Sequence, residues 1–153
     1  MRHARAASPD RDDHGRALLE EGRRDAREIV ARSAVRAEPP DVLLTSTARR
    51  TVETAEIVRE GLGLAAETVR EDARLYLASL DALLALVAER HSRGVRHLMI
   101  VGHNPGLEEL ASHLEGDGRR RHDRGFPTAA LRRYALGTAS GVDDARLLFE
   151  THP

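Results

Sequence analysis

The chain has 153 residues, of which 41% are hydrophobic and 32% charged, so it fits one ordinary globular domain with a core of its own. Its formal net charge of −1 argues against a general binder of nucleic acid or of membrane surfaces. The absence of cysteine excludes disulfides and thiol chemistry, and the lack of a long apolar stretch or a signal-peptide core predicts a cytoplasmic protein.

The first part of the chain alternates polar and apolar stretches. Residues 1–15 are polar and loop-like, and no strand precedes Arg2-His3. A helical period then runs from Leu18 to Ala34, with Glu20 and Glu21 at the end where carboxylates suit the helix dipole. Residues 38–40, Glu-Pro-Pro, break the chain, and residues 42–44, Val-Leu-Leu, predict a short buried strand.

Two amphipathic helices are predicted after this strand. Ser46 is the expected N-cap of the first, and Gly61 and Gly63 are expected to end it. Its inner face is apolar at helical spacing, through Ala48, Val52, Ala55, Val58 and Leu62. The second helix has Ser79 as its expected cap and carries Leu80, Leu83, Leu84 and Val87.

Residues 98–101, Leu-Met-Ile-Val, predict another strand buried on both faces of a parallel sheet. It stops at Gly102, and Asn104-Pro105 predicts an N-cap followed by proline at the first helical position. The helix that follows has an apolar stripe at Leu107, Leu110, Ala111 and Leu114 and ends near Gly116. His103 therefore lies where a buried strand gives way to a helix, the usual crevice for ligands in open α/β sheets.

The C-terminal part predicts a charged surface loop over residues 117–124. Residues 130–136 and 146–149 predict a closing pair of strands joined by a polar turn over 137–144. No internal repeat or linker divides the chain. The alternation of short apolar runs with amphipathic helices predicts a single three-layer α/β domain over residues 1–153.

Arginine and histidine side chains stand at both predicted strand-to-helix junctions and next to the N-terminus. Arg49 and Arg50 open one helix, His103 precedes another, and Arg2-His3 places both residue types side by side. Helix N-termini attract anions, and arginine is a planar bidentate donor to phosphate. Histidine can serve as nucleophile or proton carrier. Each residue alone also fits a plain alternative, a solvated arginine or a histidine satisfied by loop hydrogen bonds.

Together these segments form a collinear series that covers nearly the whole chain. The series contains Arg2-His3-Ala4, Arg16-Ala17-Leu18 with Glu21-Gly22, residues 44–50 with Thr54-Ala55, Arg74-Leu75-Tyr76, residues 101–106 (Val-Gly-His-Asn-Pro-Gly) and Phe126-Pro127-Thr128. In order and spacing the chain resembles the SixA-like phosphohistidine phosphatases of the histidine phosphatase superfamily. The resemblance implies a three-layer phosphoglycerate mutase-like fold with a mostly parallel central sheet.

The resemblance also implies roles for particular residues. His3 would be the nucleophile that takes the phosphoryl group, and Arg2, Arg50 and His103 would surround the phosphoryl oxygens. Counting from Ser46, Arg50 and not Arg49 aligns with the family arginine. Arg16 would touch phosphate or the edge of the substrate, and Asn104 would bind substrate; the plain alternatives are a surface arginine and a helix cap. No metal and no organic cofactor is implied.

The chain departs from the family pattern at its N-terminus. The family places an apolar strand directly before Arg-His, whereas here Arg2-His3 follows Met1. We therefore expect a fold that lacks its first, central strand, whose place would lie between the strands that end at Ser46 and His103. Without that strand, Arg2 and His3 are expected to hang from a flexible terminus. Either the given start lies a few residues too late, or the chain is impaired.

A second departure concerns the proton donor. Many members of the superfamily carry a glutamate soon after the Arg-Leu pair, where this chain has Leu77, and only Glu71 and Asp72 are acidic neighbours. An alkoxide leaving group needs a proton from such an acid, whereas an imidazole leaves more easily as a neutral ring. The missing acid favours phosphohistidine over phosphate monoesters.

The sequence thus predicts a phosphatase that removes phosphate from phosphohistidine on a protein, such as a histidine phosphotransfer domain or a similar partner. One alternative is a small-molecule phosphomonoesterase of the same fold, and another is an inactive relative that binds phosphate or a phosphoprotein. Nucleic acid is not an expected partner despite the arginines of residues 119–124, because acids are interleaved and only 3% of residues are aromatic. No histidine spacing predicts a metal site.

Overall fold

The computed structural model describes residues 1–8, 12–116, 125–137 and 145–153. The parallel sheet contains β1 (Val42–Thr45), β2 (Val69–Glu71) and β3 (Leu98–Val101) in the order β2-β1-β3. Leu44 of β1 stands opposite Arg70 of β2 and Ile100 of β3. β4 (Leu131–Ala135) and β5 (Arg146–Thr151) form an antiparallel pair, as predicted. β2 was not predicted, because it holds a single apolar residue, Val69.

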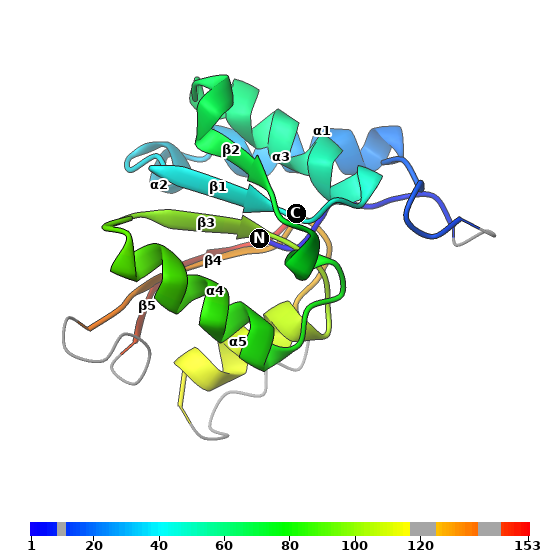
Figure 1. Cartoon of the computed structure of the whole chain (residues 1–153). Coiled ribbons are helices and arrows are strands. Elements are labelled where there is room, and N and C mark those ends of the chain that lie inside the picture. Colours follow the sequence, from blue (N-terminus) through cyan, green and yellow to red (C-terminus); the bar gives the residue numbers. More distant parts are fainter. Residues whose placement is uncertain (9–11, 117–124, 138–144) are drawn as a thin grey trace.

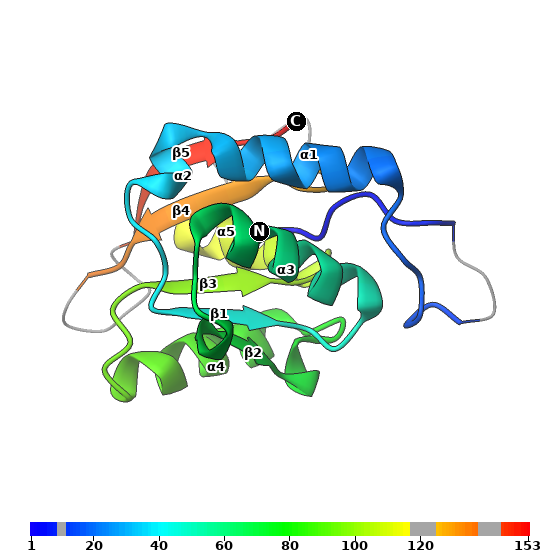
Figure 2. The same ribbon diagram turned by 90° about the horizontal axis from the view of Figure 1, so that it is seen from above.

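Helices cover both faces of the parallel sheet, so the predicted three-layer α/β fold is confirmed (Figures 1 and 2). α1 (Glu20–Ala31) and α3 (Arg49–Leu62) lie on one face, and α4 (Leu80–Ser92) and α5 (Gly106–Leu114) on the other. The short α2 (Ser33–Arg36) follows α1, and the 3₁₀ helices η1 (Ala66–Thr68) and η2 (Ala73–Leu75) flank β2. Within the described ranges, no helix is long and apolar enough to cross a membrane.

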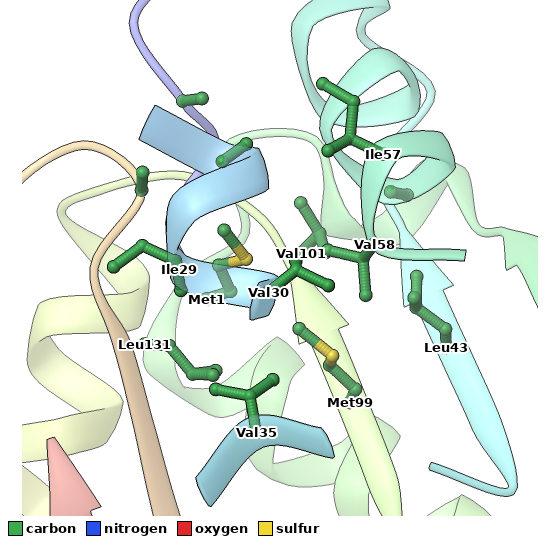
Figure 3. Packing of buried hydrophobic residues seen from close by; sticks show 14 of the residues in the cluster. Met1, Ile29, Val30, Val35, Leu43, Ile57, Val58, Met99, Val101 and Leu131 are labelled. Carbon is green, nitrogen blue, oxygen red and sulfur yellow. The ribbon is translucent and has the colours of Figure 1, made fainter. Parts of the chain in front are cut away.

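The core consists of two apolar clusters, one on each face of the sheet. Side chains alternate along a strand, so Leu43 joins the cluster under α1 and α3 while Leu44 joins the cluster under α4 and α5. Figure 3 shows the first cluster, which contains Met1 together with Ile29 and Val30 of α1 and Val58 of α3. The sheet is therefore buried on both faces, which explains its unbroken apolar runs.

Residues 1–3 do not lie at the place predicted for the family's first strand. β1 pairs directly with β3, so no strand position lies between them. Instead, residues 1–3 run between Gly102, which follows β3, and residues 129–130, which precede β4. Only an isolated parallel bridge joins Arg2 to Gly102, and β4-β5 forms a sheet separate from β2-β1-β3.

The expectation that Arg2 and His3 hang from a flexible terminus is wrong. Met1 is buried in the core, and its amino group donates to the Ile100 carbonyl at 2.7 Å. The amides of Arg2 and His3 donate to the carbonyls of Ala130 and Gly102, each at 3.0 Å. In return, Gly102 donates to Met1 and Ala129 donates to His3. Backbone pairing on both sides thus fixes the segment without a preceding strand.

Two of the three predicted N-caps, Ser46 and Asn104, need correction. Ala48, not Ser46, is the N-cap of α3, and the Ser46 hydroxyl accepts from both the Ala48 amide and Nε2 of His103. Pro105 is the N-cap of α5, which begins at Gly106, and the Asn104 side chain turns away to Glu108 and the Phe126 carbonyl. The cap at Ser79 is confirmed, as is the end of α3 at Gly63, whose φ is 66°. The loop and turn predicted for residues 117–124 and 138–144 lie outside the described residues.

Candidate active site

The site lies at the carboxyl ends of β1 and β3, where α3 and α5 begin and the N-terminal segment passes. His3, Arg50 and His103 meet there from three separate parts of the chain. The imidazole centroids of His3 and His103 are 5.3 Å apart, and Nη2 of Arg50 lies 3.2 Å from Nδ1 of His103. Three of the residues singled out from the sequence therefore meet at the edge of the sheet where a ligand site was expected.

The ring of His3 is held in one tautomer. Its Nδ1 lies 2.8 Å from the carbonyl oxygen of Ala4, and a carbonyl only accepts hydrogen bonds. Nδ1 therefore carries the proton and Nε2 keeps its lone pair. The Ala4 amide in turn donates to Oγ1 of Thr54 at 3.1 Å, which ties the residue after His3 to α3. Nε2 is therefore the ring nitrogen that carries a lone pair and no proton.

His103 has the opposite tautomer. A guanidinium only donates, so Nδ1 of His103 accepts from Nη2 of Arg50. Its Nε2 then carries the proton and donates to Oγ of Ser46 at 2.9 Å. Both ring nitrogens are thus engaged, and the side chain is buried. For His103 to donate to a bound group, Nε2 must give up its hydrogen bond to Ser46.

Both histidines are neutral at neutral pH. Burial is the main cause that lowers the pKa of His3 to about 4, and the charges of Arg50, Arg2 and Arg16 lower it further against the hydrogen bond to Ala4. Burial, followed by the charge of Arg50, lowers the pKa of His103 to about 3. A neutral imidazole at His3 is the form that can attack phosphorus.

Arg50 is buried, with 2% of its side chain exposed, whereas Arg49 is exposed and pairs with Glu53 at 2.8 Å. The register counted from Ser46 therefore places Arg50, and not Arg49, against His103. Arg2 donates through Nη1 to the Phe126 carbonyl at 2.8 Å. The Nε of Arg2 and the Nε of Arg50 are both buried without a hydrogen-bond partner. A bound oxyanion would supply an acceptor for such donors.

Arg16 and Asn104 reach the site through other residues. Arg16 donates to Oδ1 of Asp13 from Nε at 2.9 Å and from Nη2 at 2.7 Å. Asn104 donates to the Phe126 carbonyl at 3.1 Å, the same carbonyl that accepts from Arg2. Its Oδ1 is buried without a partner. Neither residue fits its plain alternative, since Arg16 is not a free surface arginine and Asn104 caps no helix.

Asp13 and Tyr76 are the residues of the site that the sequence did not reveal. The Tyr76 hydroxyl donates to Oδ2 of Asp13 at 2.8 Å, and its ring stands edge-on to His103 with centroids 5.5 Å apart. Asp13 lies in a polar loop with no periodicity to mark it. Tyr76 belongs to the Arg-Leu-Tyr motif, and that membership was the one available signal.

The acidic neighbours named from the sequence do not serve the site. Asp72 pairs with Arg74 at 2.7 Å and with Arg90 at 3.5 Å, and Glu71 is exposed on β2. Among the described contacts, none joins either carboxylate to His3 or His103. Leu77, at the place of the family glutamate, is 54% exposed. In the described part of the chain, no group of three or more His, Cys, Asp or Glu side chains could hold a metal ion.

Comparisons with known proteins agree with this geometry. The profile of the histidine phosphatase superfamily (branch 1) matches residues 1–76, while no curated protein sequence matches the chain. A protein of Agrobacterium tumefaciens assigned as the phosphohistidine phosphatase SixA is 29% identical, with a TM-score of 0.84 over 100% of this chain and 95% of that one. A protein of Nakamurella multipartitia with the same assignment is 27% identical, with a TM-score of 0.78 over 100% and 93% of the two chains.

The likeness extends to a protein histidine phosphatase SixA complexed with tungstate. That structure is 20% identical, with a TM-score of 0.83 over 99% of this chain and 94% of that one, and it supports the fold. Family and neighbours together support a phosphatase, a hydrolase of phosphoryl compounds. Residues 1–76 thus match the histidine phosphatase superfamily, and over its full length the chain is similar to SixA proteins.

Proposed function

We propose that the chain hydrolyses phosphohistidine on a protein through a phosphorylated intermediate on His3. One observation carries the proposal: Nε2 of His3 keeps its lone pair because Nδ1 donates to the Ala4 carbonyl. This nucleophile lies beside His103 and Arg50. The charges of Arg2, Arg50 and Arg16 all act on it. A neutral nucleophile among fixed cations suits attack on an anionic phosphoryl group.

The reaction proceeds in two displacements. Nε2 of His3 attacks phosphorus while the bond from phosphorus to the substrate imidazole breaks, and the departing ring nitrogen takes a proton from solvent. Water then attacks the phosphoryl group on His3, releasing inorganic phosphate and restoring the neutral imidazole. Arg2 and Arg50 stabilise the charge that spreads over the phosphoryl oxygens in both steps. His103 joins them when its Nε2–H exchanges the hydrogen bond to Ser46 for one to a phosphoryl oxygen.

The carboxylates around the site support phosphohistidine as the substrate. Hydrogen bonds from Tyr76 and then Arg16 lower the pKa of Asp13 to about 2, so this carboxylate is ionised and has no proton to donate. Asp72 and Glu71 lack described contacts with either histidine. An alkoxide would therefore leave without help, whereas an imidazole does not need a strong acid. The corresponding partner is a phosphorylated protein of the histidine phosphotransfer kind.

Trapping the intermediate tests this function. The protein is incubated with a ³²P-labelled phosphohistidine peptide and quenched in alkali, where phosphohistidine survives. We expect label on His3 and release of phosphate, with both abolished in His3→Ala and both retained in the exposed-residue control His113→Ala. Label and turnover that persist in His3→Ala would rule the mechanism out. Label without turnover would identify a phosphate-binding relative, and faster turnover of phosphate monoesters would identify a phosphomonoesterase.

A further inference from the structure

One carboxylate, that of Asp13, joins three of the polar side chains around the site. Its Oδ1 accepts both hydrogen bonds from Arg16, and its Oδ2 accepts from the Tyr76 hydroxyl at 2.8 Å and from Nη2 of Arg50 at 3.1 Å. The Asp13 backbone carbonyl also accepts from Nη1 of Arg50 at 2.6 Å. No other described carboxylate contacts Arg50 or Tyr76 by hydrogen bond or ion pair.

The contacts to Arg50 fix its orientation. Asp13 engages both terminal nitrogens of the guanidinium, one through the backbone and one through the side chain, and this pair of contacts defines the plane of the group. With that plane fixed, Nη2 also reaches Nδ1 of His103, and the partnerless Nε is held in place. The buried Arg50 cation would otherwise lack a counter-charge, which costs far more than a lost surface ion pair.

The same carboxylate also orients Tyr76, which contacts the site from another part of the chain. Tyr76 is held by its hydroxyl on Asp13, and its ring packs edge-on against His103. Because Arg50 and Tyr76 both contact His103, the ring of that histidine is braced from two sides by residues that Asp13 holds. Arg16, which has no described contact with Arg50, is tied to it through the two carboxylate oxygens.

We propose that Asp13 is a positioning residue, which holds Arg50, Arg16 and Tyr76 in the arrangement that stabilises the transferring phosphoryl group. It acts through these residues and donates no proton. This inference rests on the proposed function for its consequence in catalysis, but the hold of Asp13 on Arg50 is a property of the free protein and is measured separately.

The proposal predicts a split between binding and rate. Asp13→Asn removes one negative charge, so the site still attracts an anionic substrate, and we expect KM to change by less than about threefold. The arginines lose their fixed geometry, and we expect kcat to fall by about 10- to 100-fold, as for loss of comparable supporting hydrogen bonds. Asp12→Asn is the matched control, because it makes the same charge change at the neighbouring residue. The Asp12 side chain accepts from the Gly15 amide rather than contacting the site.

Nuclear magnetic resonance of the free protein tests the hold directly. We expect the ¹⁵Nε signal of Arg50 to show a heteronuclear NOE close to that of the α3 backbone in the parent protein and in Asp12→Asn. In Asp13→Asn that NOE should fall by about half, as the guanidinium becomes mobile. An unchanged NOE would overturn the proposal, and this result does not depend on whether the protein hydrolyses phosphohistidine.

The kinetic arm uses a milder second variant. Tyr76→Phe removes only the hydroxyl contact with Asp13, and we expect a fall in kcat of about two- to fivefold. If both residues act through one arrangement, the double variant should be no slower than Asp13→Asn alone. Full kcat in Asp13→Asn, or losses that multiply in the double variant, would overturn the positioning role. An inactive parent protein would refute the proposed function instead, while the NOE still decides the hold on Arg50.

Discussion

His3 and His103 have the same side chain but opposite proton positions, and their immediate neighbours set that difference. A carbonyl acceptor places the proton of His3 on Nδ1, and a guanidinium donor keeps the proton of His103 on Nε2. The first ring therefore offers a lone pair from Nε2, while the second has both nitrogens committed. In the proposed reaction the first ring attacks phosphorus, and the second contacts Arg50, the cation proposed to bind the phosphoryl group.

The pKa values of these rings predict a response to acid. The pKa of His3 is lowered to about 4 and that of His103 to about 3, so kcat/KM should stay level from pH 8 to 5 on account of these groups and fall below about pH 4. Between pH 6.5 and about 4 the unfolded chain binds protons that the folded chain excludes, so stability should also fall as the pH falls. Ring-proton resonances of His3 and urea midpoints check both points. A His3 resonance that titrates near pH 6.5 would contradict the buried geometry.

Adjacent arginines provide a matched pair at the start of α3. Arg50→Ala should cost several kcal/mol of transition-state stabilisation, since a buried donor to the phosphoryl oxygens is lost. Arg49→Ala should be nearly silent, because Arg49 makes an exposed ion pair with Glu53. Comparison of kcat/KM in the two variants, corrected for the folded fraction, decides the matter. Equal losses in the two variants would show that Arg50 was wrongly chosen over Arg49 as the functional arginine of α3.

At the scale of elements, α3 places two functional groups on one face. Arg50 and Thr54 are one turn apart, and Oγ1 of Thr54 donates to the Arg50 carbonyl at 2.7 Å while it accepts from Ala4. The helix thus carries an arginine of the site and also anchors the residue after His3. A rigid helix sets the spacing between these two parts of the site.

The sequence predicted the existence of this helix but not its buried polar face. Apolar spacing identified Ala55 and Val58, which are buried, but it also included Val52, which is only half-buried. Arg50, Thr51 and Thr54 are buried because hydrogen bonds satisfy them, and a hydrophobic period cannot reveal such residues. Arg50 was recognised through its motif, whereas Asp13, in a loop with neither period nor assigned motif, was missed.

Gly106, the first residue of α5, packs closely against the segment before α4, so a larger residue at this position should disturb the packing. A Cβ at Gly106 would lie 2.0 Å from the Ala78 carbonyl oxygen, so Gly106→Ala must displace α5 or the segment that carries Tyr76. We expect a loss of about 1–3 kcal/mol in the free energy of unfolding, together with a lower kcat. Gly102→Ala is the control, because its Cβ would meet no atom closer than 3.5 Å. Urea denaturation of both variants measures the difference, and equal midpoints would refute the close contact.

At the scale of the whole molecule, residues 1–3 are the only described segment between β3 and the residues that lead into β4. The sequence predicted that a central strand is lacking, since no apolar run precedes Arg2-His3. It placed that strand wrongly, because the order of strands in a sheet follows from the path of the whole chain and not from a local pattern. The burial of Met1 among Ile29, Val30 and Val101 was equally invisible in the sequence (Figure 3).

An extension of about five apolar residues ahead of Met1 tests this part of the fold. Burial lowers the pKa of the Met1 amino group from 8.0 to about 5. Between these values the unfolded chain binds a proton that the folded chain excludes, so the stability of the 153-residue form should rise from pH 5 to pH 8. The extension moves the amino group out of the core, and new strand residues can pair with β3 on one side and β4 on the other.

We expect the extended form to have the higher urea midpoint, a smaller change in midpoint between pH 6 and 8, and faster phosphohistidine turnover, since His3 would sit on a longer strand. A control extension of five Gly and Ser residues displaces the amino group but supplies little apolar surface for the core. It should lose the same pH dependence without the gain in midpoint. If the 153-residue form matches the apolar extension in midpoint at pH 8 and in turnover, the hydrogen bonds of residues 1–4 suffice by themselves. The prediction that a longer first strand is needed for stability and turnover would then be wrong, because backbone pairing with Gly102, Ala129 and Ala130 would hold residues 1–3 in place without it.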